Sequence, residues 1–148
     1  MDIEEIIKAF FYDLLGDDIK MDIDVTEEEV SVELELDTEH SGIVIGYRGE
    51  VLTSIQLILS LMIQDNYEDW LPVRVNVNNY REQRAEALEK LAENTASRVK
   101  ESGQALSLPN LSSYERRHIH NILSEIEGVE SYSEGEGVNR ILIIAPIE

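Results

Sequence analysis

The chain has 148 residues, of which 43% are hydrophobic, so it can form one ordinary domain or two small ones and is not a disordered polypeptide. It contains no cysteine, which excludes disulfides, thiolate metal sites and a cysteine nucleophile. The net charge of −19 is uneven: residues 1–40 hold 15 acidic and 2 basic residues, whereas residues 41–100 hold 8 and 7. Because affinity for phosphates comes largely from Lys and Arg, a nucleic-acid site is favoured outside the first 40 residues.

No targeting or membrane-spanning segment is predicted. The N-terminus lacks the basic start and the unbroken apolar run of a signal peptide. The most apolar run, residues 51–63, is interrupted by four polar residues and is too short to span a bilayer. We therefore expect a cytoplasmic protein without membrane insertion.

The first 36 residues predict a helix followed by two strands. Apolar residues recur at helical spacing from residue 3 to residue 15, before Gly16. The pattern then changes to period two over residues 19–25 and 30–36, which indicates a hairpin of two half-buried strands. The opposite face of these strands carries acidic side chains, which we interpret as the solvated side of a sheet: Asp22, Asp24, Glu33, Glu35 and Asp37.

A short helix over residues 38–45, a Gly-x-x-Gly segment, a helix to about residue 65 and a strand over residues 73–77 follow. Apolar residues occupy most of the circumference of the second of these helices, so we expect it to be well buried. The order helix, strand, strand, helix, helix, strand predicts an α+β domain over residues 1–79.

The remaining residues predict a second small α+β domain over residues 80–148. A long helix runs to residue 102, and a brief strand is expected at residues 105–108. A helix over residues 112–126 precedes two strands over residues 129–134 and 138–145. The predicted fold class is thus α+β, with two small α/β sandwiches in tandem.

The segment Gly46-Tyr47-Arg48-Gly49 is the first predicted site. Glycine tolerates φ > 0 and has no Cβ, so two glycines let a tight loop present its backbone to a ligand. The helix that follows offers unpaired N–H groups to an anion, and Arg48 adds a cation. A simple turn is the alternative interpretation of these four residues on their own.

Arg116 and His120 form the second predicted site. They are four residues apart on the predicted helix, so both project from one side and together could bind a phosphate. The alternative is that both make ordinary structural contacts. A metal-dependent phosphoesterase using His118, His120 and Glu115 is a weaker reading, because residues two apart on a helix point away from each other.

Enzyme templates do not fit this sequence. The glycines at 135 and 137 join two strands and lack the third glycine of a dinucleotide fingerprint. The sequence has no phosphate loop, zinc-protease histidine pair or serine elbow. We predict no catalytic residue, no cofactor and no resident metal.

The order of elements around the glycine loop resembles a KH domain of the second, prokaryotic topology. The run containing Arg116, His120 and Arg140 resembles the domain named for an Arg and a His separated by three residues, the R-3-H domain. The tandem is similar to the Jag, or SpoIIIJ-associated, family of bacterial RNA-binding proteins. Tyr47 departs from the pattern, since it stands where a second cation is common, which implies a weaker electrostatic grip with a stacking contribution.

The resemblance implies binding of single-stranded RNA, or single-stranded DNA, by both domains, with KH loops clamping about four nucleotides. It implies a regulator acting after transcription, linked to growth, division or sporulation, and a homodimer or a heterodimer with another KH protein. The alternative is a protein–protein module that has lost most RNA affinity. The residues implicated in nucleic-acid binding are Ile45, Gly46, Tyr47, Arg48, Gly49, Arg81, Arg84, Arg116, Arg117, His120 and Arg140.

Overall fold

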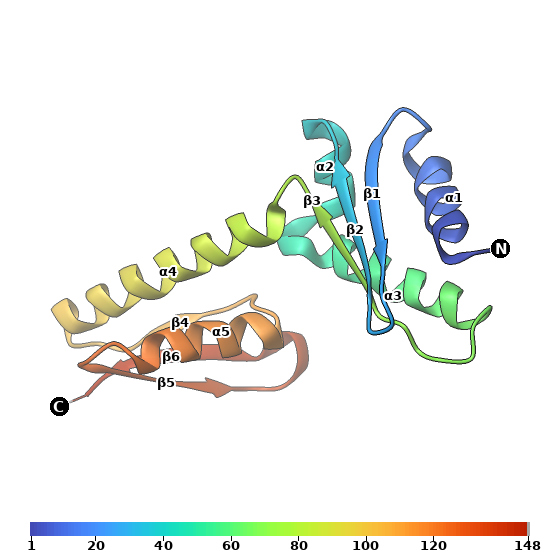
Figure 1. Cartoon of the computed structure of the whole chain (residues 1–148). Coiled ribbons are helices and arrows are strands. Elements are labelled where there is room, and N and C mark those ends of the chain that lie inside the picture. The colour runs from blue at the N-terminus through green and yellow to red at the C-terminus, as the bar shows by residue number, and fades with distance from the viewer. Residues whose placement is uncertain (148) are drawn as a thin grey trace. The chain divides into compact units, whose positions relative to one another are not determined.

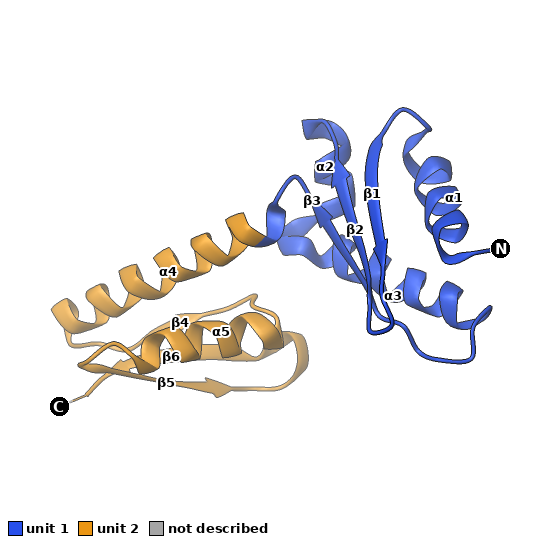
Figure 2. Ribbon diagram, in the orientation of Figure 1, with its two compact units in different colours: residues 1–81 blue, residues 82–148 orange. Residues whose placement is uncertain are grey.

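The computed structural model describes residues 1–147, which divide into two units, residues 1–81 and the described residues from 82 onward (Figure 2). Figure 1 labels the elements in chain order. The predicted order of elements is confirmed in both halves, and each unit has its own sheet and its own apolar core.

Unit 1 is a three-stranded sheet with three helices contributing to its core. Strand β1 (Lys20–Val25) pairs antiparallel with β2 (Val30–Glu35), and β2 pairs parallel with β3 (Val73–Val77). The core joins the inner face of this sheet to side chains of α1 (Ile3–Leu15), α2 (Thr38–Ile45) and α3 (Glu50–Gln64). Alternation places Val30, Val32 and Leu34 inward, because successive side chains of a strand point to opposite faces.

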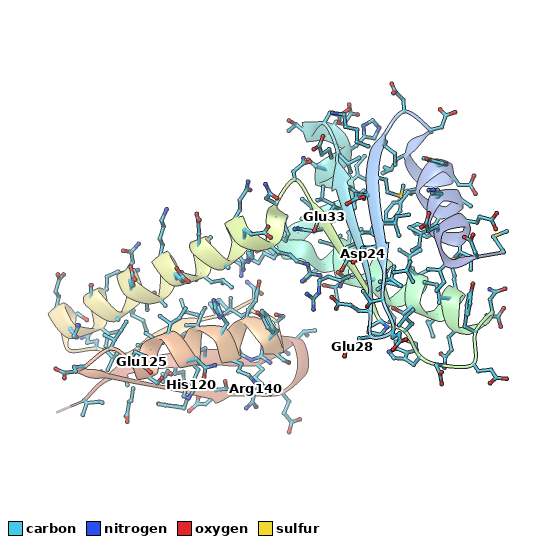
Figure 3. All side chains as sticks on the ribbon, in the orientation of Figure 1. Asp24, Glu28, Glu33, His120, Glu125 and Arg140 are labelled. Atoms are coloured by element: carbon cyan, nitrogen blue, oxygen red, sulfur yellow. The ribbon has the colours of Figure 1, made fainter. Side chains whose placement is uncertain are left out.

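The acidic side chains of the hairpin lie on the other face of this sheet. Asp22 is directly opposite Glu33 in the register of β1 and β2, and both side chains are exposed. Figure 3 labels Asp24, Glu28 and Glu33 in this part of unit 1. The interpretation of this face as the solvated side of the sheet is confirmed by the exposure of all five predicted residues.

The expectation that α3 is buried around most of its circumference is wrong. One face of α3 enters the core through residues such as Leu52, Ile55 and Leu59. The other face stays exposed, with Leu57 at 56%, Leu61 at 51% and neighbouring apolar side chains also accessible. Unit 1 has a single sheet, which covers only one side of α3. The apolar composition of α3 therefore predicted more burial than the helix has.

Residues 38–64 are long and apolar enough to cross a membrane by length and composition alone. The structure divides this stretch, however, into α2, the turn η1 (Tyr47–Gly49) and α3. Positive φ angles at Gly46, Arg48 and Gly49 separate the two helices, and α3 has 15 residues, fewer than the roughly 20 that a spanning helix needs.

Unit 2 is an antiparallel sheet packed against two helices. Strand order is β4 (Leu106–Leu108), β6 (Ile141–Pro146), β5 (Val129–Glu134). The part of helix α4 (Tyr80–Ser102) that lies in unit 2 packs an apolar stripe of side chains into the unit 2 core. Helix α5 (Ser113–Ser124) packs Ile119 and Leu123 into the same core. The last strand begins at Ile141 and not at residue 138, because residues Gly137–Asn139 form a 3-10 turn (η2).

Candidate nucleic-acid interface

The loop between α2 and α3 depends on both of its glycines. Gly46 has φ 69° and ψ −170°, a combination that is essentially restricted to glycine, and Gly49 has φ 79°. A Cβ on Gly46 would lie 2.3 Å from Cγ2 of Val51, and a Cβ on Gly49 would lie 3.1 Å from Cε1 of Tyr80. The predicted need for positive φ is confirmed, and the close packing of Val51 and Tyr80 adds a second requirement for glycine.

The two residues between the glycines are exposed. Arg48 itself has φ 52°, and its guanidinium carbon lies 5.1 Å from the centre of the Tyr47 ring, a cation–π arrangement. Tyr47 is 61% exposed, and the apolar side chains of Ile43 and Val51 beside the loop are also exposed. An aromatic ring, a cation and an apolar strip are thus accessible together at the start of α3.

The first turn of α3 has no side-chain cap. Its cap residue is Gly49, which carries no side chain that could accept from the N–H groups of the helix. The N–H of Glu50 donates to the carbonyl of Tyr47, and the Glu50 carboxylate lies in this first turn. The N–H groups that follow at a helix start are donors for an anion. The loop can therefore offer a phosphate both backbone donors and the Arg48 guanidinium.

The helix α2 that leads into this loop is capped by an acid. The Oδ1 atom of Asp37 accepts from the backbone N–H of His40 at 2.8 Å, and its Oδ2 atom lies 2.8 Å from Nδ1 of His40. These hydrogen bonds, the backbone bond first, hold the pKa of Asp37 below its ordinary value. The ionised form of the Asp37 carboxylate is therefore favoured when α2 is folded.

A pocket of about 510 Å³ lies between α5, β5 and the segment before β6 in unit 2. It brings together four of the side chains that the sequence predicted for nucleic-acid binding, three from α5 and one from the segment before β6. Figure 3 labels His120 and Arg140 in this region. The residues that line the pocket are Ser113, Arg116, Arg117, His120, Ser131, Tyr132, Ser133 and Arg140.

The orientation of Arg116 is set by two hydrogen bonds. Its Nη1 atom donates to the carbonyl of Leu111 at 2.6 Å, and its Nη2 atom donates to Oγ of Ser113 at 3.1 Å. Arg140 is held in a similar way, since its Nη1 atom donates to the carbonyl of Gly135 at 2.6 Å. A guanidinium has five N–H donors, so both side chains keep further donors for a ligand.

The helix that presents these groups begins with a capping box. The Ser112 hydroxyl accepts from the N–H of Glu115, and the Glu115 carboxylate accepts from the N–H of Ser112. Glu115 is 8% exposed and also forms a 2.8 Å ion pair with Nε of Arg84 on α4. Arg84 therefore connects α4 to the start of α5.

Arg81 lies in unit 1 and contacts the sheet. Its Nε atom donates to the carbonyl of Val75 at 3.4 Å, and its Nη2 atom donates to Oε1 of Gln56 on α3. The structure thus gives Arg81 and Arg84 partners within the protein and does not place either among the residues lining the unit 2 pocket.

The two histidines of α5 point in different directions. His120 bonds to Ser131 on β5 through Nδ1, whereas His118 stacks against Tyr114 at 6.2 Å between ring centres. The rings do not converge as a shared metal site with Glu115 would require, since the carboxylate of Glu115 is engaged by Arg84 and the helix start.

Sequence reasoning missed the serines of the pocket. Val129, Ser131 and Ser133 alternate along β5 and therefore share one face of the strand, the face that meets α5. Val129 is in the core, whereas Ser131 and Ser133 are small polar residues that line the pocket. Period-two alternation with serine in place of an apolar residue was the signal available in the sequence.

Two family models match the chain and fall on separate units. The model described as KhpA/KhpB, KH domain matches residues 2–77, and the model described as R-3-H domain matches residues 86–146. The chain belongs to the KhpA/KhpB family of KH-domain proteins. This membership confirms the family resemblance and the predicted fold class, a KH domain followed by an R-3-H domain.

Several curated relatives of this KhpA/KhpB-type chain are named RNA-binding protein KhpB. The one from Streptococcus pneumoniae is 35% identical over 147 residues, which are 97% of this chain and 45% of the relative. The one from Clostridium symbiosum is 40% identical over 128 residues, 86% of this chain and 57% of the relative. The one from Bacillus subtilis is 32% identical over 128 residues, 85% of this chain and 62% of the relative. The chain spans about half the length of the curated relatives it matches.

Proposed function

We propose that this chain binds single-stranded RNA without catalysing a reaction, through the KH loop and the R-3-H pocket. The observation that carries the proposal is the pocket, because three arginines and one histidine line it and no carboxylate of residues 1–147 does, in a chain of net charge −19. A phosphodiester accepts hydrogen bonds only, so it matches side chains that can all donate. The name of these relatives, RNA-binding protein, supports the same ligand class.

The KH loop supplies the second contact. Backbone N–H groups at the start of α3 and the Arg48 guanidinium would hold phosphates, while Tyr47 offers a face on which a base can stack. The exposed apolar side chains of Ile43 and Val51, with the half-buried Ile45, would line a groove for bases. One cation between the glycines makes this a weak site by itself, so the pocket is needed for useful affinity.

Fluorescence anisotropy with a short labelled single-stranded RNA at about 50 mM salt tests the proposal, because phosphate contacts are strongest at low salt. Changing Tyr47 and Arg48 together to Asp should weaken binding, and changing Arg117 and His120 together to Ala should weaken it about ten-fold or more. Arg98→Asp is the matched control, since Arg98 is an exposed arginine of α4 that does not line the pocket. Absence of binding by the unaltered chain at low salt would refute the proposal.

The finer parts of the proposal follow from family membership. We propose that the chain acts in the bacterial cytoplasm, without membrane insertion, as a regulator of RNA after transcription that is linked to growth, division or sporulation. RNA should be preferred to single-stranded DNA of the same sequence, because a 2′-hydroxyl adds both a donor and an acceptor. Equal affinity for RNA and DNA would mean that the chain binds single-stranded nucleic acids without selecting RNA.

A second candidate function is protein association through α3. Its exposed face carries large apolar side chains, and residues 51–64 contain no charged residue in a chain that is 29% charged. A homodimer, or a heterodimer with another KH protein, would bury this face. Light scattering of the unaltered chain against Leu61→Glu tests it, with Leu14→Glu as the matched control, since Leu14 is a comparably exposed leucine of α1. A monomer at all concentrations, with no partner KH protein retained, would argue against this second function.

A further inference from the structure

Gly49 is the buried residue of the KH loop (residues 46–49). Tyr47 and Arg48, which precede it, are both exposed, whereas Gly49 is buried. The space beside its Cα is filled by Tyr80, since a Cβ on Gly49 would lie 3.1 Å from Cε1, 3.2 Å from Oη and 3.5 Å from Cζ of that side chain. Tyr80 therefore packs directly against the backbone of the loop.

The backbone of the KH loop needs support from outside the loop. Arg48 has φ 52°, a region that a residue with a Cβ disfavours. The hydrogen bond from the N–H of Gly49 to the carbonyl of Gly46 is 3.5 Å long, whereas such bonds are usually about 2.9–3.0 Å. A disfavoured backbone persists only where the surrounding structure enforces it. Val51 packs closely against Gly46, and Tyr80 does the same at Gly49.

The chain just before Tyr80 is fixed to the sheet of unit 1. Helix α4 begins at Tyr80, and only Asn78 and Asn79 separate it from β3 (Figure 1). The amide of Asn78 pairs with the backbone of Leu36, because its Oδ1 atom accepts from the N–H at 2.9 Å and its Nδ2 atom donates to the carbonyl at 2.8 Å. Asn78 and Asn79 have φ 50° and 59°, which asparagine tolerates better than most residues.

The residue just after Tyr80 is fixed as well. The backbone N–H of Arg81 donates to Oδ1 of Asn76 at 3.2 Å, and Asn76 is only 4% exposed. The Arg81 guanidinium donates to the carbonyl of Val75 and to Oε1 of Gln56 on α3. Gln56 also accepts from the N–H of Val75 at 2.9 Å. Tyr80 is thus anchored on both sides to the sheet and to α3, and its half-buried ring packs against the core of unit 1.

We propose that Tyr80 is a positioning residue of the KH loop: its ring, held in place by the start of α4, keeps the loop in the conformation that binds a phosphodiester. The inference rests on the proposed RNA binding and names a determinant of it. A loop that is already ordered loses little backbone freedom when the ligand binds, so support from Tyr80 raises affinity. The KH family model ends at residue 77, so this support comes from outside the segment that the model matches.

Nitrogen-15 relaxation of the full chain without RNA is the first test. The order parameters of Arg48 and Gly49 should be about 0.85 in the unaltered chain and below about 0.6 in Tyr80→Leu, which stays apolar but has no ring. Tyr80→Phe keeps the ring and should preserve the order. Phe10→Leu is the matched control, because Phe10 is a partly buried ring of α1 on the same core and is not among the atoms nearest to Gly49.

RNA affinity at about 50 mM salt is the second test. Fixing the backbone of one residue corresponds to about a five- to thirty-fold change in an equilibrium constant. Tyr80→Leu should therefore weaken binding of the short single-stranded RNA about five-fold or more, whereas Tyr80→Phe and Phe10→Leu should stay within about two-fold. In a chain that already carries Tyr47→Asp and Arg48→Asp, Tyr80→Leu should cause no further loss, because residues that act through one contact are not additive.

Four results would overturn the inference. The first is an unchanged order parameter at Arg48 and Gly49 in a folded Tyr80→Leu variant. The second is an equal loss of affinity in Tyr80→Phe, which would assign the effect to the hydroxyl and not to the ring. The third is an equal loss of order in Phe10→Leu, which would reflect general loosening of unit 1. The fourth is an undiminished loss in the chain with Tyr47→Asp and Arg48→Asp, which would mean that Tyr80 acts independently of the loop.

The remaining outcomes separate this inference from the proposed function. If Tyr80→Leu does not fold, Tyr80→Met is measured by the same criteria. If the chain with Tyr47→Asp and Arg48→Asp binds too weakly to measure, the order parameters decide. If the unaltered chain binds no RNA, the proposed function fails, whereas the order parameters still decide whether Tyr80 holds the loop. If the unaltered chain binds RNA and Tyr80→Leu binds equally, only the role of Tyr80 is refuted.

Discussion

Replacement of Gly46 by alanine should strongly destabilise unit 1. Alanine at φ 69° and ψ −170° would occupy a backbone region that is essentially restricted to glycine. Its Cβ would also lie 2.3 Å from Cγ2, 2.8 Å from Cβ and 3.1 Å from the backbone nitrogen of Val51. Rotation of the Val51 side chain can relieve only the first of these contacts, so the backbone of α3 would have to move.

The magnitude follows from these two terms. A residue forced into such a region costs about 1–3 kcal/mol, and overpacking costs a further 1–3 kcal/mol, so the loss should be about 2–6 kcal/mol. A unit of 81 residues has a free energy of unfolding of about 4–12 kcal/mol at ordinary stability per residue. Gly46→Ala would therefore remove a large part of the stability of unit 1, and RNA affinity at the loop should fall with it.

Urea unfolding followed by the fluorescence of Trp70 measures this loss, because Trp70 is the single tryptophan of the chain and belongs to unit 1. Gly42→Ala is the matched control. Gly42 lies inside α2 without a positive φ, and a Cβ there would meet nothing within 4 Å, so alanine should stabilise by about 0.5–1 kcal/mol. An unfolding midpoint for Gly46→Ala equal to that of the unaltered chain would refute the reasoning.

Three further predictions concern other contacts. Arg84→Met should lower the stability of unit 2 by about 3–5 kcal/mol, because it leaves the buried carboxylate of Glu115 without its cation. Thermal denaturation followed by circular dichroism measures this loss, and an unchanged midpoint would show that the ion pair is dispensable. Because the pKa of Asp37 is lowered in the folded state, its carboxylate stabilises α2 at pH values above the ordinary pKa, and this stabilisation is lost as the pH falls through the lowered pKa. The difference in free energy of unfolding between the unaltered chain and Asp37→Asn should therefore vanish in acid. A difference that does not depend on pH would contradict this. Arg117→Ala should reduce the slope of log affinity for single-stranded RNA against log salt by about 0.7, and an unchanged slope would remove Arg117 from the phosphate contacts.

The fold was predictable because its signals are local. Helical spacing in residues 3–15 and period-two alternation in the hairpin each follow from the geometry of one element, and the structure confirms both. The positive φ of Gly46 and Gly49 was predictable for the same reason, since only glycine tolerates that backbone without strain. The i, i+4 spacing of Arg116 and His120 likewise placed them on one side of a helix that was recognisable from sequence.

Contacts between elements could not be predicted in this way. Nothing local in the sequence pairs Arg84 with Glu115, which lie 31 residues apart, or places Ser131 beside His120. The exposure of Leu57 and Leu61 was missed for a related reason, because composition records how apolar a helix is and not how many sides the sheet covers.

The sequence by itself determined the two domains, the order of their elements, the glycine loop and the Arg-x-x-x-His spacing, since each depends on the conformation of neighbouring residues. Only the tertiary structure decided which cations meet in a pocket and which are engaged within the protein. It gathered Arg116, Arg117, His120 and Arg140 from α5 and the segment before β6, and it gave His120 a partner on β5. Packing brings together side chains that are distant in sequence, and that packing decides which groups are left to meet a ligand.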